Sequence, residues 1–309
     1  MTIPDYQTLM LPLLKRAAKG EISVPDIRED IADEFSLNSE ERELLLKSGT
    51  RVIDNRLHWA KIYLSKAGLI VTPTRGRFIA TSEGKSLLNR NPARIDNGAL
   101  TQYPSFLEFV RGRAGSSLGG NDNSSEGAGV AQVNSTPEEQ IDSAVNALQA
   151  TLRSDLLQKI LKNSPSFFEK LIVDLLVAMG YGGSIQDAAT ELLGRAGDGG
   201  VDGVINEDRL GLDRIYVQAK RYTDGVVGRP EVQAFVGSLV GLGASKGVFV
   251  TTSRFSQQAS DFVKNLSQRI ILIDGQRLAD LMIEYNVGVR VSRSIEFKRV
   301  DEDFFSDDE

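Results

Sequence analysis

Apolar residues recur at helical spacing through the first part of the chain. The stripes are Leu9, Leu13, Leu14 and Ala17; then Ile27, Ile31 and Phe35; then Leu57, Ala60 and Leu64. Apolar side chains repeated three and four residues apart indicate helices that turn one face toward a core. The third stripe predicts a helix from about Val52 to Ala67, with Gly68 as its stop.

Two short apolar runs follow this predicted helix and frame a turn-rich segment. The runs are Leu69-Ile70-Val71 and Phe78-Ile79-Ala80, and residues 72–77 between them read TPTRGR. This pattern predicts a β-hairpin with basic residues at its tip. Three helices followed by such a hairpin are typical of a winged-helix domain, in which the third helix enters the major groove of DNA.

The segment from Gly112 to about Asn134 separates two regions of different pattern. It is rich in Gly, Ser and Asn and has almost no large apolar residue. Such a segment cannot bury enough surface to offset its chain entropy, which predicts a flexible linker. We therefore expect a first domain over residues 1–111, a linker over residues 112–135 and a second domain over residues 136–309.

The second region opens with helices and then changes to strands. Thr136-Pro137-Glu138-Glu139 has the pattern of a helix cap. The apolar residues that follow it at helical spacing are Ile141, Val145, Leu148, Leu152 and Leu156. A second helix is predicted from residue 164 to Gly180, and later helices begin near residues 256 and 278. The predicted strands are residues 201–205, 215–219, 247–252 and 270–273. This alternation implies an α/β sandwich.

Composition restricts the kinds of site that the chain can build. It has no cysteine and a single histidine, His58, which excludes disulfides and thiolate zinc sites and argues against a multi-histidine metal site. Any metal would therefore be held by oxygen ligands, which favours Mg²⁺ or Ca²⁺. The start of the sequence lacks the basic and apolar regions of a signal peptide, and no apolar run approaches the roughly 20 residues of a membrane span. We therefore expect a cytoplasmic protein.

Positive charge is concentrated in one part of an acidic chain. The net charge is −6, yet residues 42–94 contain 11 basic and 3 acidic residues, a balance of 11 − 3 = +8. A local basic field of this kind can neutralise DNA phosphates whatever the total charge is. The candidates for DNA contact on the third helix and the hairpin are Arg51, Asn55, Arg56, Arg75 and Arg77. The alternative is a solvated surface on a protein-interaction domain.

An aspartate flanked by glycines stands at the mouth of the first predicted strand of the second domain. Residues 197–205 read GDGGVDGVI and include Asp202, and the glycines let the backbone approach a ligand closely. The next strand contains Gln218 and Lys220, which face the same side because side chains alternate along a strand. If the two strands are neighbours, Asp202, Gln218 and Lys220 converge on one point.

This convergence suits the hydrolysis of a phosphodiester bond. We expect Asp202 to bind Mg²⁺ with the amide oxygen of Gln218 and the main-chain carbonyl of Ala219, because the metal polarises the phosphate and activates a bound water. Lys220 would position or deprotonate the attacking water and offset the developing charge. Glu169, on the preceding helix, is a further carboxylate candidate for the metal.

Three hydroxyl side chains end a later strand of the second domain. Thr251, Thr252 and Ser253 follow its apolar run directly. They are candidates for hydrogen bonds to phosphate oxygens near the predicted site. Alternatively, they cap the following helix.

These motifs together resemble a known family. The second domain is similar to the PD-(D/E)xK nucleases, and specifically to the Mrr type of restriction endonuclease, over about residues 164–289. The matching segments are Phe167-Phe168-Glu169, residues 197–203, residues 217–221, residues 228–235, residues 247–253 and Ile273-Asp274-Gly275. The first domain resembles the Mrr N-terminal winged-helix domain. Its matching residues are Asn55-Arg56, Trp59-Ala60, Leu64, Ala67-Gly68-Leu69 and Arg75-Gly76.

The resemblance implies an α/β protein with a mostly helical winged-helix domain and an α/β/α restriction-endonuclease-like domain. It implies a Mg²⁺-dependent, type IV-like enzyme that cleaves methylated double-stranded DNA in the cytoplasm of a bacterium or archaeon. Gln218 stands where most PD-(D/E)xK nucleases have a second acidic residue, and Gln is the form expected in the Mrr group. Its neutral side chain should weaken metal binding. Cleavage of both strands needs two active sites, so we expect a homodimer or higher homo-oligomer.

Two other functions fit the same residues. One is a DNA-binding or regulatory protein whose nuclease fold is catalytically inactive. The other is a nuclease for branched or damaged DNA, whose first domain does not recognise methylation. The fold alone does not separate these functions, because function depends on the site.

Overall fold

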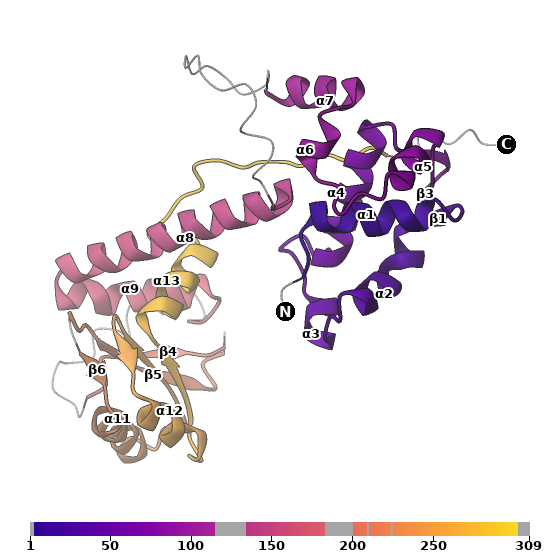
Figure 1. Cartoon of the computed structure of the whole chain (residues 1–309). Helices are drawn as coiled ribbons and strands as arrows, with labels where there is room; N and C mark the ends of the chain where they lie inside the picture. The colour runs from indigo at the N-terminus through magenta and orange to yellow at the C-terminus, as the bar shows by residue number, and fades with distance from the viewer. Residues whose placement is uncertain (1–2, 115–133, 183–199, 209, 224, 302–309) are drawn as a thin grey trace. The chain divides into compact units, whose positions relative to one another are not determined.

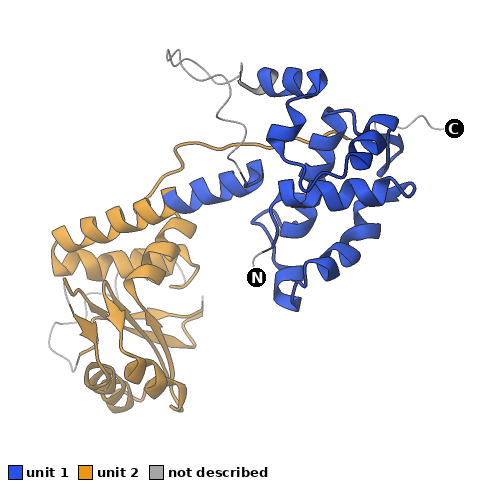
Figure 2. Ribbon diagram, in the orientation of Figure 1, with its two compact units in different colours: residues 1–147 blue, residues 148–309 orange. Residues whose placement is uncertain are grey.

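A computed structural model of the chain describes residues 3–114, 134–182, 200–208, 210–223 and 225–301 (Figure 1). The chain divides into two compact units, residues 1–147 and residues 148–309 (Figure 2). This boundary lies inside a helix, whereas the sequence placed the start of the second domain at residue 136. Most of the predicted linker, residues 115–133, lies outside the described residues.

The first unit combines helices with a small antiparallel sheet. Its elements in chain order are α1 (Tyr6–Ala17), β1 (Ile22–Ser23), α2 (Val24–Glu34), α3 (Ser39–Glu43), α4 (Val52–Lys66), β2 (Ile70–Thr74), β3 (Arg77–Ala80), α5 (Ser82–Asn89), α6 (Asn97–Leu100) and α7 (Pro104–Ala114). The strand order is β1-β3-β2. Helices α1, α2 and α4 with the β2–β3 hairpin form the predicted winged helix. The strand β1 has only two residues, too few to leave a hydrophobic pattern in the sequence.

The apolar stripes of the sequence form the core of this unit. Leu57, Ala60 and Leu64 on α4 are fully buried, as are Leu9 and Leu13 on α1. All of them belong to one continuous cluster of buried side chains. The largest set of contacts between helices of this unit joins α1 and α4. The sequence therefore predicted both the existence of α4 and the face that it buries.

The hairpin is tighter than the sequence predicted. The predicted turn covered residues 72–77, but β2 continues to Thr74 and β3 begins at Arg77. The turn itself is Arg75-Gly76, where Gly76 has a φ of 74°, a backbone conformation that favours glycine. Pro73 has no main-chain N–H to donate. It is compatible with β2 because β2 is an edge strand, where one side of the strand forms no hydrogen bonds within the sheet.

The second unit is built around a mixed four-stranded sheet. Its elements are α8 (Pro137–Lys162, shared with the first unit), α9 (Pro165–Ala178), β4 (Gly203–Asn206), β5 (Arg214–Lys220), β6 (Val226–Val227), α11 (Arg229–Gly241), β7 (Lys246–Thr251), β8 (Arg254–Phe255), α12 (Gln257–Lys264), β9 (Arg269–Ile273) and α13 (Gly275–Glu284). The strand order is β4-β5-β7-β9. Strand β4 is antiparallel to β5, and the other pairs are parallel.

Helices cover both faces of this sheet, so the unit has three layers (Figure 1). One cluster of buried side chains joins α8, α9 and α13 to one face, and includes Leu171, Val217 and Leu278. A second cluster joins α11 and α12 to the other face, and includes Phe235 and Phe249. The predicted α/β/α fold class is therefore confirmed. The predicted adjacency of the first two strands is also confirmed, because β4 pairs with β5.

Helix α8 is long and unevenly buried. At about 1.5 Å per residue its 26 residues extend over about 39 Å. Within the apolar stripe predicted for it, Leu156 is buried but Leu148 is 71% exposed. Only the last part of α8 packs in the core of the second unit. Among the described helices, none combines the length and the apolar character that a membrane span requires.

Candidate active site and DNA-binding surface

Asp202 is held at the edge of the sheet by two main-chain contacts. Its own N–H donates to the carbonyl of Val217 at 2.8 Å. Its carboxylate Oδ2 accepts the N–H of Ala219 at 2.7 Å. The carboxylate therefore takes the place that a main-chain carbonyl would have in the next step of the β4–β5 ladder. This fixes the position of the side chain beside the strand that carries Lys220.

Gln218 and Lys220 lie on the same side of β5, as the strand alternation predicted. Lys220 is half-buried and ends the strand. Gln218 is only 7% exposed, and its amide oxygen is buried without a hydrogen-bond partner among the described residues. Its amide nitrogen lies beside Gly200, which has a φ of 90° and where a Cβ atom would be 3.5 Å from that nitrogen. A buried acceptor without a partner marks a place for a cation or a water.

Glu169 lies in the first turns of α9, close enough to Asp202 for the two carboxylates to repel each other. Its side chain is half-buried, and burial is the main reason that its pKa is raised, with the nearby Asp202 carboxylate as the second cause. A hollow of about 260 Å³ opens next to it. The residues lining that hollow are Pro165, Phe168, Glu169, Ala219, Lys220, Arg221 and Tyr222. The second domain thus brings Glu169, Asp202, Ala219 and Lys220 to one place.

The donor set fits a hard cation better than a soft one. Within the described parts of the chain, no three His, Asp or Glu side chains are grouped closely enough to hold a metal by themselves. Asp202 and Glu169 supply two carboxylates, and their mutual repulsion would be relieved by a positive ion. The other candidate donors are neutral, namely the buried amide oxygen of Gln218 and the main-chain carbonyl of Ala219. All of these ligands are oxygens, which suits Mg²⁺.

The three hydroxyl side chains at the end of β7 have internal partners. Thr252 Oγ1 accepts the N–H of Tyr222 and donates to its carbonyl, both at 2.9 Å. Thr251 Oγ1 accepts the N–H of Ser253, and the Ser253 hydroxyl donates to the carbonyl of Gly225. The cap of α12 is Ser256 instead. Thr252 and Ser253 therefore fasten the end of β7 to the segment after Lys220, and the predicted capping of the following helix by these residues is wrong.

In the first unit, two of the predicted DNA-binding residues are engaged by the start of α8. Asn55 is 7% exposed, and its amide oxygen accepts the hydroxyl of Thr136 at 2.6 Å. Arg56 forms an ion pair with Glu139 at 2.6 Å and also donates to the carbonyl of Pro4. Both side chains are therefore occupied by partners within the first unit, and Asn55 is buried as well.

Two further contacts join the same segment to Trp59 on α4 and to Lys47 in the loop before α4. The indole N–H of Trp59 donates to Glu138 at 2.6 Å. The main-chain N–H of Lys47 donates to Asp142 at 3.1 Å. Residues 136–142, called the α8 cover below, therefore lie along one side of α4. Nothing in the sequence pattern of Thr136-Pro137-Glu138-Glu139 beyond helix capping predicted this contact.

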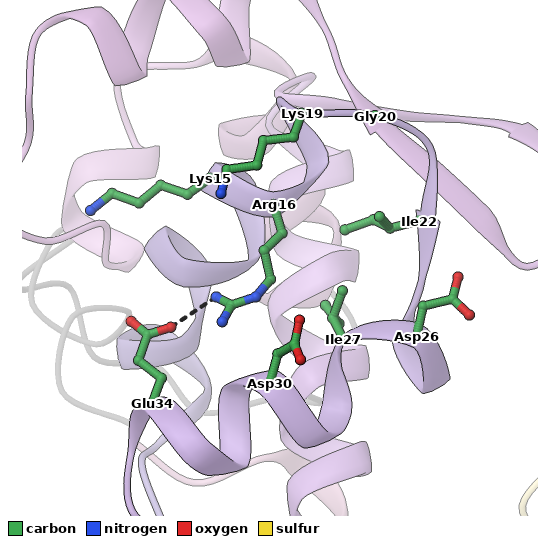
Figure 3. Close-up of a pocket in the computed structure, with 9 residues that line it drawn as sticks. All are labelled: Lys15, Arg16, Lys19, Gly20, Ile22, Asp26, Ile27, Asp30 and Glu34. Carbon is green, nitrogen blue, oxygen red and sulfur yellow. Dashed lines mark hydrogen bonds and ion pairs between the residues drawn. The ribbon is translucent and has the colours of Figure 1, made fainter.

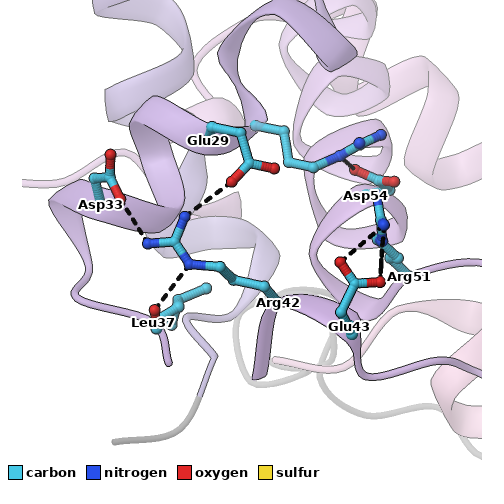
Figure 4. Close-up of polar contacts among 8 residues, drawn as sticks. Glu29, Asp33, Leu37, Arg42, Glu43, Arg51 and Asp54 are labelled. Carbon is cyan, nitrogen blue, oxygen red and sulfur yellow. Dashed lines mark hydrogen bonds and ion pairs between the residues drawn. The ribbon is translucent and has the colours of Figure 1, made fainter. Parts of the chain in front are cut away.

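Most arginines of the basic window are paired with acidic residues. Arg51 contacts Glu43 at 2.8 Å, and Arg42 contacts Glu29 at 2.8 Å and Asp33 at 2.5 Å (Figure 4). Arg77 lies 3.3 Å from Glu21 and 3.4 Å from Asp26. Many of these acids precede residue 42, so the balance of +8 overstated the free positive charge. Arg75 is exposed at the hairpin turn.

A larger hollow of about 550 Å³ in the first unit lies between the end of α1 and α2. Side chains of both signs line it, and Arg16 forms an ion pair with Glu34 at 2.8 Å (Figure 3). The other charged side chains that line it are Lys15, Lys19, Asp26 and Asp30. None of the residues predicted to bind DNA or metal lines this hollow, and its mixed charge favours neither ligand.

Comparisons with known proteins match both halves of the chain. A family model described as a restriction endonuclease matches residues 160–282, and a model described as the Mrr N-terminal domain matches residues 6–90. The chain is 36% identical, over 308 residues, to the type IV methyl-directed restriction enzyme EcoKMrr of Escherichia coli strain K12. That alignment covers 99% of this chain and 100% of the relative.

Two solved structures also resemble the chain. They are the DNA modification-dependent restriction endonuclease AspBHI and the restriction endonuclease MspJI in complex with a 27-mer oligonucleotide, each at 22% identity and a TM-score of 0.35. The similarity covers 56% and 69% of this chain respectively. The chain matches less than half the length of each structure, 41% and 49%.

Proposed function

Because the chain belongs to the Mrr family of restriction endonucleases, we propose that it is a type IV enzyme that cleaves methylated double-stranded DNA with Mg²⁺. The observation that carries the proposal is the Asp202 carboxylate fixed on the N–H of Ala219, with Lys220 next along the strand and Glu169 close by. The methyl-directed action of the full-length relative from Escherichia coli supports the choice of substrate.

The carboxylates and neutral oxygens around β5 would hold the metal. The ligands that we propose are Asp202, Glu169, the amide oxygen of Gln218 and the carbonyl of Ala219. Bound Mg²⁺ would polarise the scissile phosphate and lower the pKa of a bound water. Asp202 cannot turn away from this position easily, because it also completes the β4–β5 ladder. Ion binding would offset the repulsion that raises the pKa of Glu169.

Lys220 supplies the positive side chain of the proposed site. It lines the same hollow as Glu169. From there its ammonium group would orient the attacking water and offset charge that develops on the phosphate. We therefore propose that replacing Lys220 stops cleavage while DNA affinity is retained.

The first unit would hold the DNA through α4 and the hairpin. Among the predicted residues, Arg75 is exposed at the turn, and Arg51 and Arg77 lie on the surface with acidic partners. Asn55 and Arg56 would reach DNA only after the α8 cover leaves them. We propose that the protein acts in the cytoplasm as a homodimer or higher homo-oligomer, because cutting both strands needs two active sites.

The test is cleavage of one plasmid, methylated and unmethylated, in Mg²⁺ by the wild type and by Asp202→Ala. We expect cleavage of the methylated plasmid only, and its loss in the variant. Equal cleavage of both plasmids would retain the nuclease and remove the methyl-dependent specificity. Binding without any cleavage would favour an inactive, DNA-binding protein.

A further inference from the structure

Arg221 makes two hydrogen bonds that the proposed reaction does not yet explain. It follows Lys220 directly, and its side chain is half-buried. Its Nη1 group donates to the carbonyl of Leu161 at 2.7 Å and also to the carbonyl of Asn163. These carbonyls lie at the C-terminal end of α8, where a helix leaves its last acceptors without main-chain partners. A cation is favourable at that end of a helix.

The point that Arg221 holds is the corner between α8 and α9. Ser164 follows Asn163 and caps α9 by accepting the N–H of Phe167 at 3.1 Å. Glu169 lies in the first turns of α9, a few residues beyond this cap. The position of the corner therefore determines where the carboxylate of Glu169 lies. Phe168, beside it, is fully buried and anchors the same turn in the core.

The main chain of Arg221 follows directly after β5, the strand that carries the site. Ala219, whose N–H holds Asp202, is two residues before it. Glu169, Lys220 and Arg221 line one hollow. The guanidinium group thus joins the end of β5 to the corner between α8 and α9, from which the α9 wall of the hollow begins. Both of its hydrogen bonds go to main-chain carbonyls and not to a carboxylate.

We propose that Arg221 is a positioning residue for DNA cleavage, which sets the separation between Glu169 and the Asp202–Ala219 pair. This inference rests on the proposed function, because Glu169 and Asp202 are its proposed metal ligands. Residues that orient metal ligands from outside the ligand set commonly change metal affinity or activity by about 10–100-fold. An effect through Glu169 should disappear when Glu169 itself is replaced.

A double-mutant cycle on the full chain tests this dependence. The variants are Arg221→Met, Glu169→Gln and the two together, with Mn²⁺ affinity measured by calorimetry as a readout that does not require cleavage. We expect each single variant to weaken Mn²⁺ binding by about tenfold and the double variant to be no weaker than either. Lys162→Met is the matched control, because it removes an exposed positive charge from the same end of α8. It should leave Mn²⁺ affinity unchanged.

Arg221→Lys keeps the positive charge at the helix end and should restore part of the loss. If Arg221→Met does not fold, as judged by circular dichroism, the same cycle is measured with Arg221→Lys. Losses that multiply to about a hundredfold in the double variant would overturn the proposal, because Arg221 would then act independently of Glu169.

DNA affinity measured without divalent metal distinguishes the positioning role of Arg221 from direct binding of a DNA phosphate. We expect Arg221→Met to change this affinity by less than about threefold, since the side chain is directed at carbonyls. A loss as large as the loss in Mn²⁺ affinity would make Arg221 a phosphate ligand and overturn the proposal. If the wild type cleaves no DNA but the Mn²⁺ cycle is non-additive, the positioning role stands and the proposed reaction fails.

Discussion

Asp202 has a structural role, in its hydrogen bond to the N–H of Ala219, and a proposed role in cleavage through its negative charge. Substitutions can separate the two roles. Asp202→Asn keeps an oxygen that can accept the N–H of Ala219, but it removes the negative charge. We expect unfolding free energy close to that of the wild type and DNA cleavage slower by at least about a hundredfold. Asp202→Ala should lose cleavage and about 1 kcal/mol of stability as well, because it leaves the N–H of Ala219 without an acceptor.

Urea unfolding and plasmid cleavage of the three proteins measure these effects. Equal stability of Asp202→Ala and Asp202→Asn would mean that the hydrogen bond to Ala219 contributes nothing to the ladder. Cleavage by Asp202→Asn at the wild-type rate would remove Asp202 from the reaction.

The raised pKa of Glu169 makes stability depend on pH in the metal-free protein. A folded-state pKa above the unfolded value gives stability that is present at low pH and lost as pH rises through the folded pKa. Glu169→Gln does not ionise, so it should become more stable than the wild type as pH rises toward neutrality. At low pH the two proteins should be equally stable, and Mg²⁺ should reduce the difference at neutral pH.

Thermal unfolding across a pH series, with a chelator and then with Mg²⁺, measures the effect. Asp174→Asn is the matched control, because Asp174 is exposed on the same helix. A pH-independent difference between Glu169→Gln and the wild type would contradict the prediction.

At single positions, the sequence predicted side chains of recognisable chemistry and missed contacts to the main chain. The spacing of Gln218 and Lys220 predicted that both lie on the strand paired with β4, and the glycines around Asp202 marked the carboxylate that accepts the N–H of Ala219. The role of Arg221 had no such signal, because its partners are carbonyl groups that every residue possesses. The partners of Thr252 were missed for the same reason.

Among the elements, the α8 cover is the contact that bears most on DNA binding. Glu139→Gln keeps an acceptor for the helix cap but removes the charge that pairs with Arg56. A half-buried ion pair of about 1 kcal/mol corresponds to about fivefold in affinity. We therefore expect Glu139→Gln to bind duplex DNA about fivefold more tightly, measured by fluorescence anisotropy at fixed salt.

The control for this variant is Asp155→Asn, which removes one negative charge from an exposed position further along α8. An equal gain in both variants would reflect only the lower negative charge of the protein. Weaker binding by Glu139→Gln would mean that the α8 cover is a permanent part of the DNA-binding surface.

Element boundaries were predicted less well than element types. The hairpin was predicted, but its turn was predicted too long, because Pro73 suggested a loop. The structure places Pro73 within β2, an edge strand, where proline is tolerated. The predicted apolar stripe of α8 identified a helix but not its burial, because Leu148 and Leu152 are exposed. Periodicity gives the apolar face of a helix, and the partner that covers the face comes from distant parts of the chain.

For the whole molecule, cleavage of both DNA strands requires two active sites. If these belong to two copies of the chain, an excess of Asp202→Asn protein should convert wild-type cleavage from linear to nicked plasmid product. Gel analysis of product forms at increasing mixing ratios measures this. The control is an excess of Asp202→Asn protein that also carries Arg75→Ala and Arg77→Ala, which would compete less for DNA. Linear product at every ratio would argue for one chain that cuts both strands.

Ion pairs determine how much of the positive charge of the molecule remains free to bind DNA. The molecule is acidic, and its basic window was predicted to be a free positive field. Because ion pairs depend on contacts between separate elements, a count along the sequence could not show that Arg42 and Arg77 are neutralised. We therefore expect the affinity for DNA to fall less steeply with salt concentration than the number of arginines in this window would imply.

The sharing of α8 between the two units has a consequence for how such proteins can recombine. A gene fusion that joined a different DNA-reading module at the predicted linker would leave residues 136–142 behind on the nuclease side. Asn55, Arg56 and Trp59 would then lose the partners that this segment supplies. An exchange of modules between relatives that preserves these contacts therefore has its crossover inside α8, near residue 147, and not in the glycine-rich stretch before it.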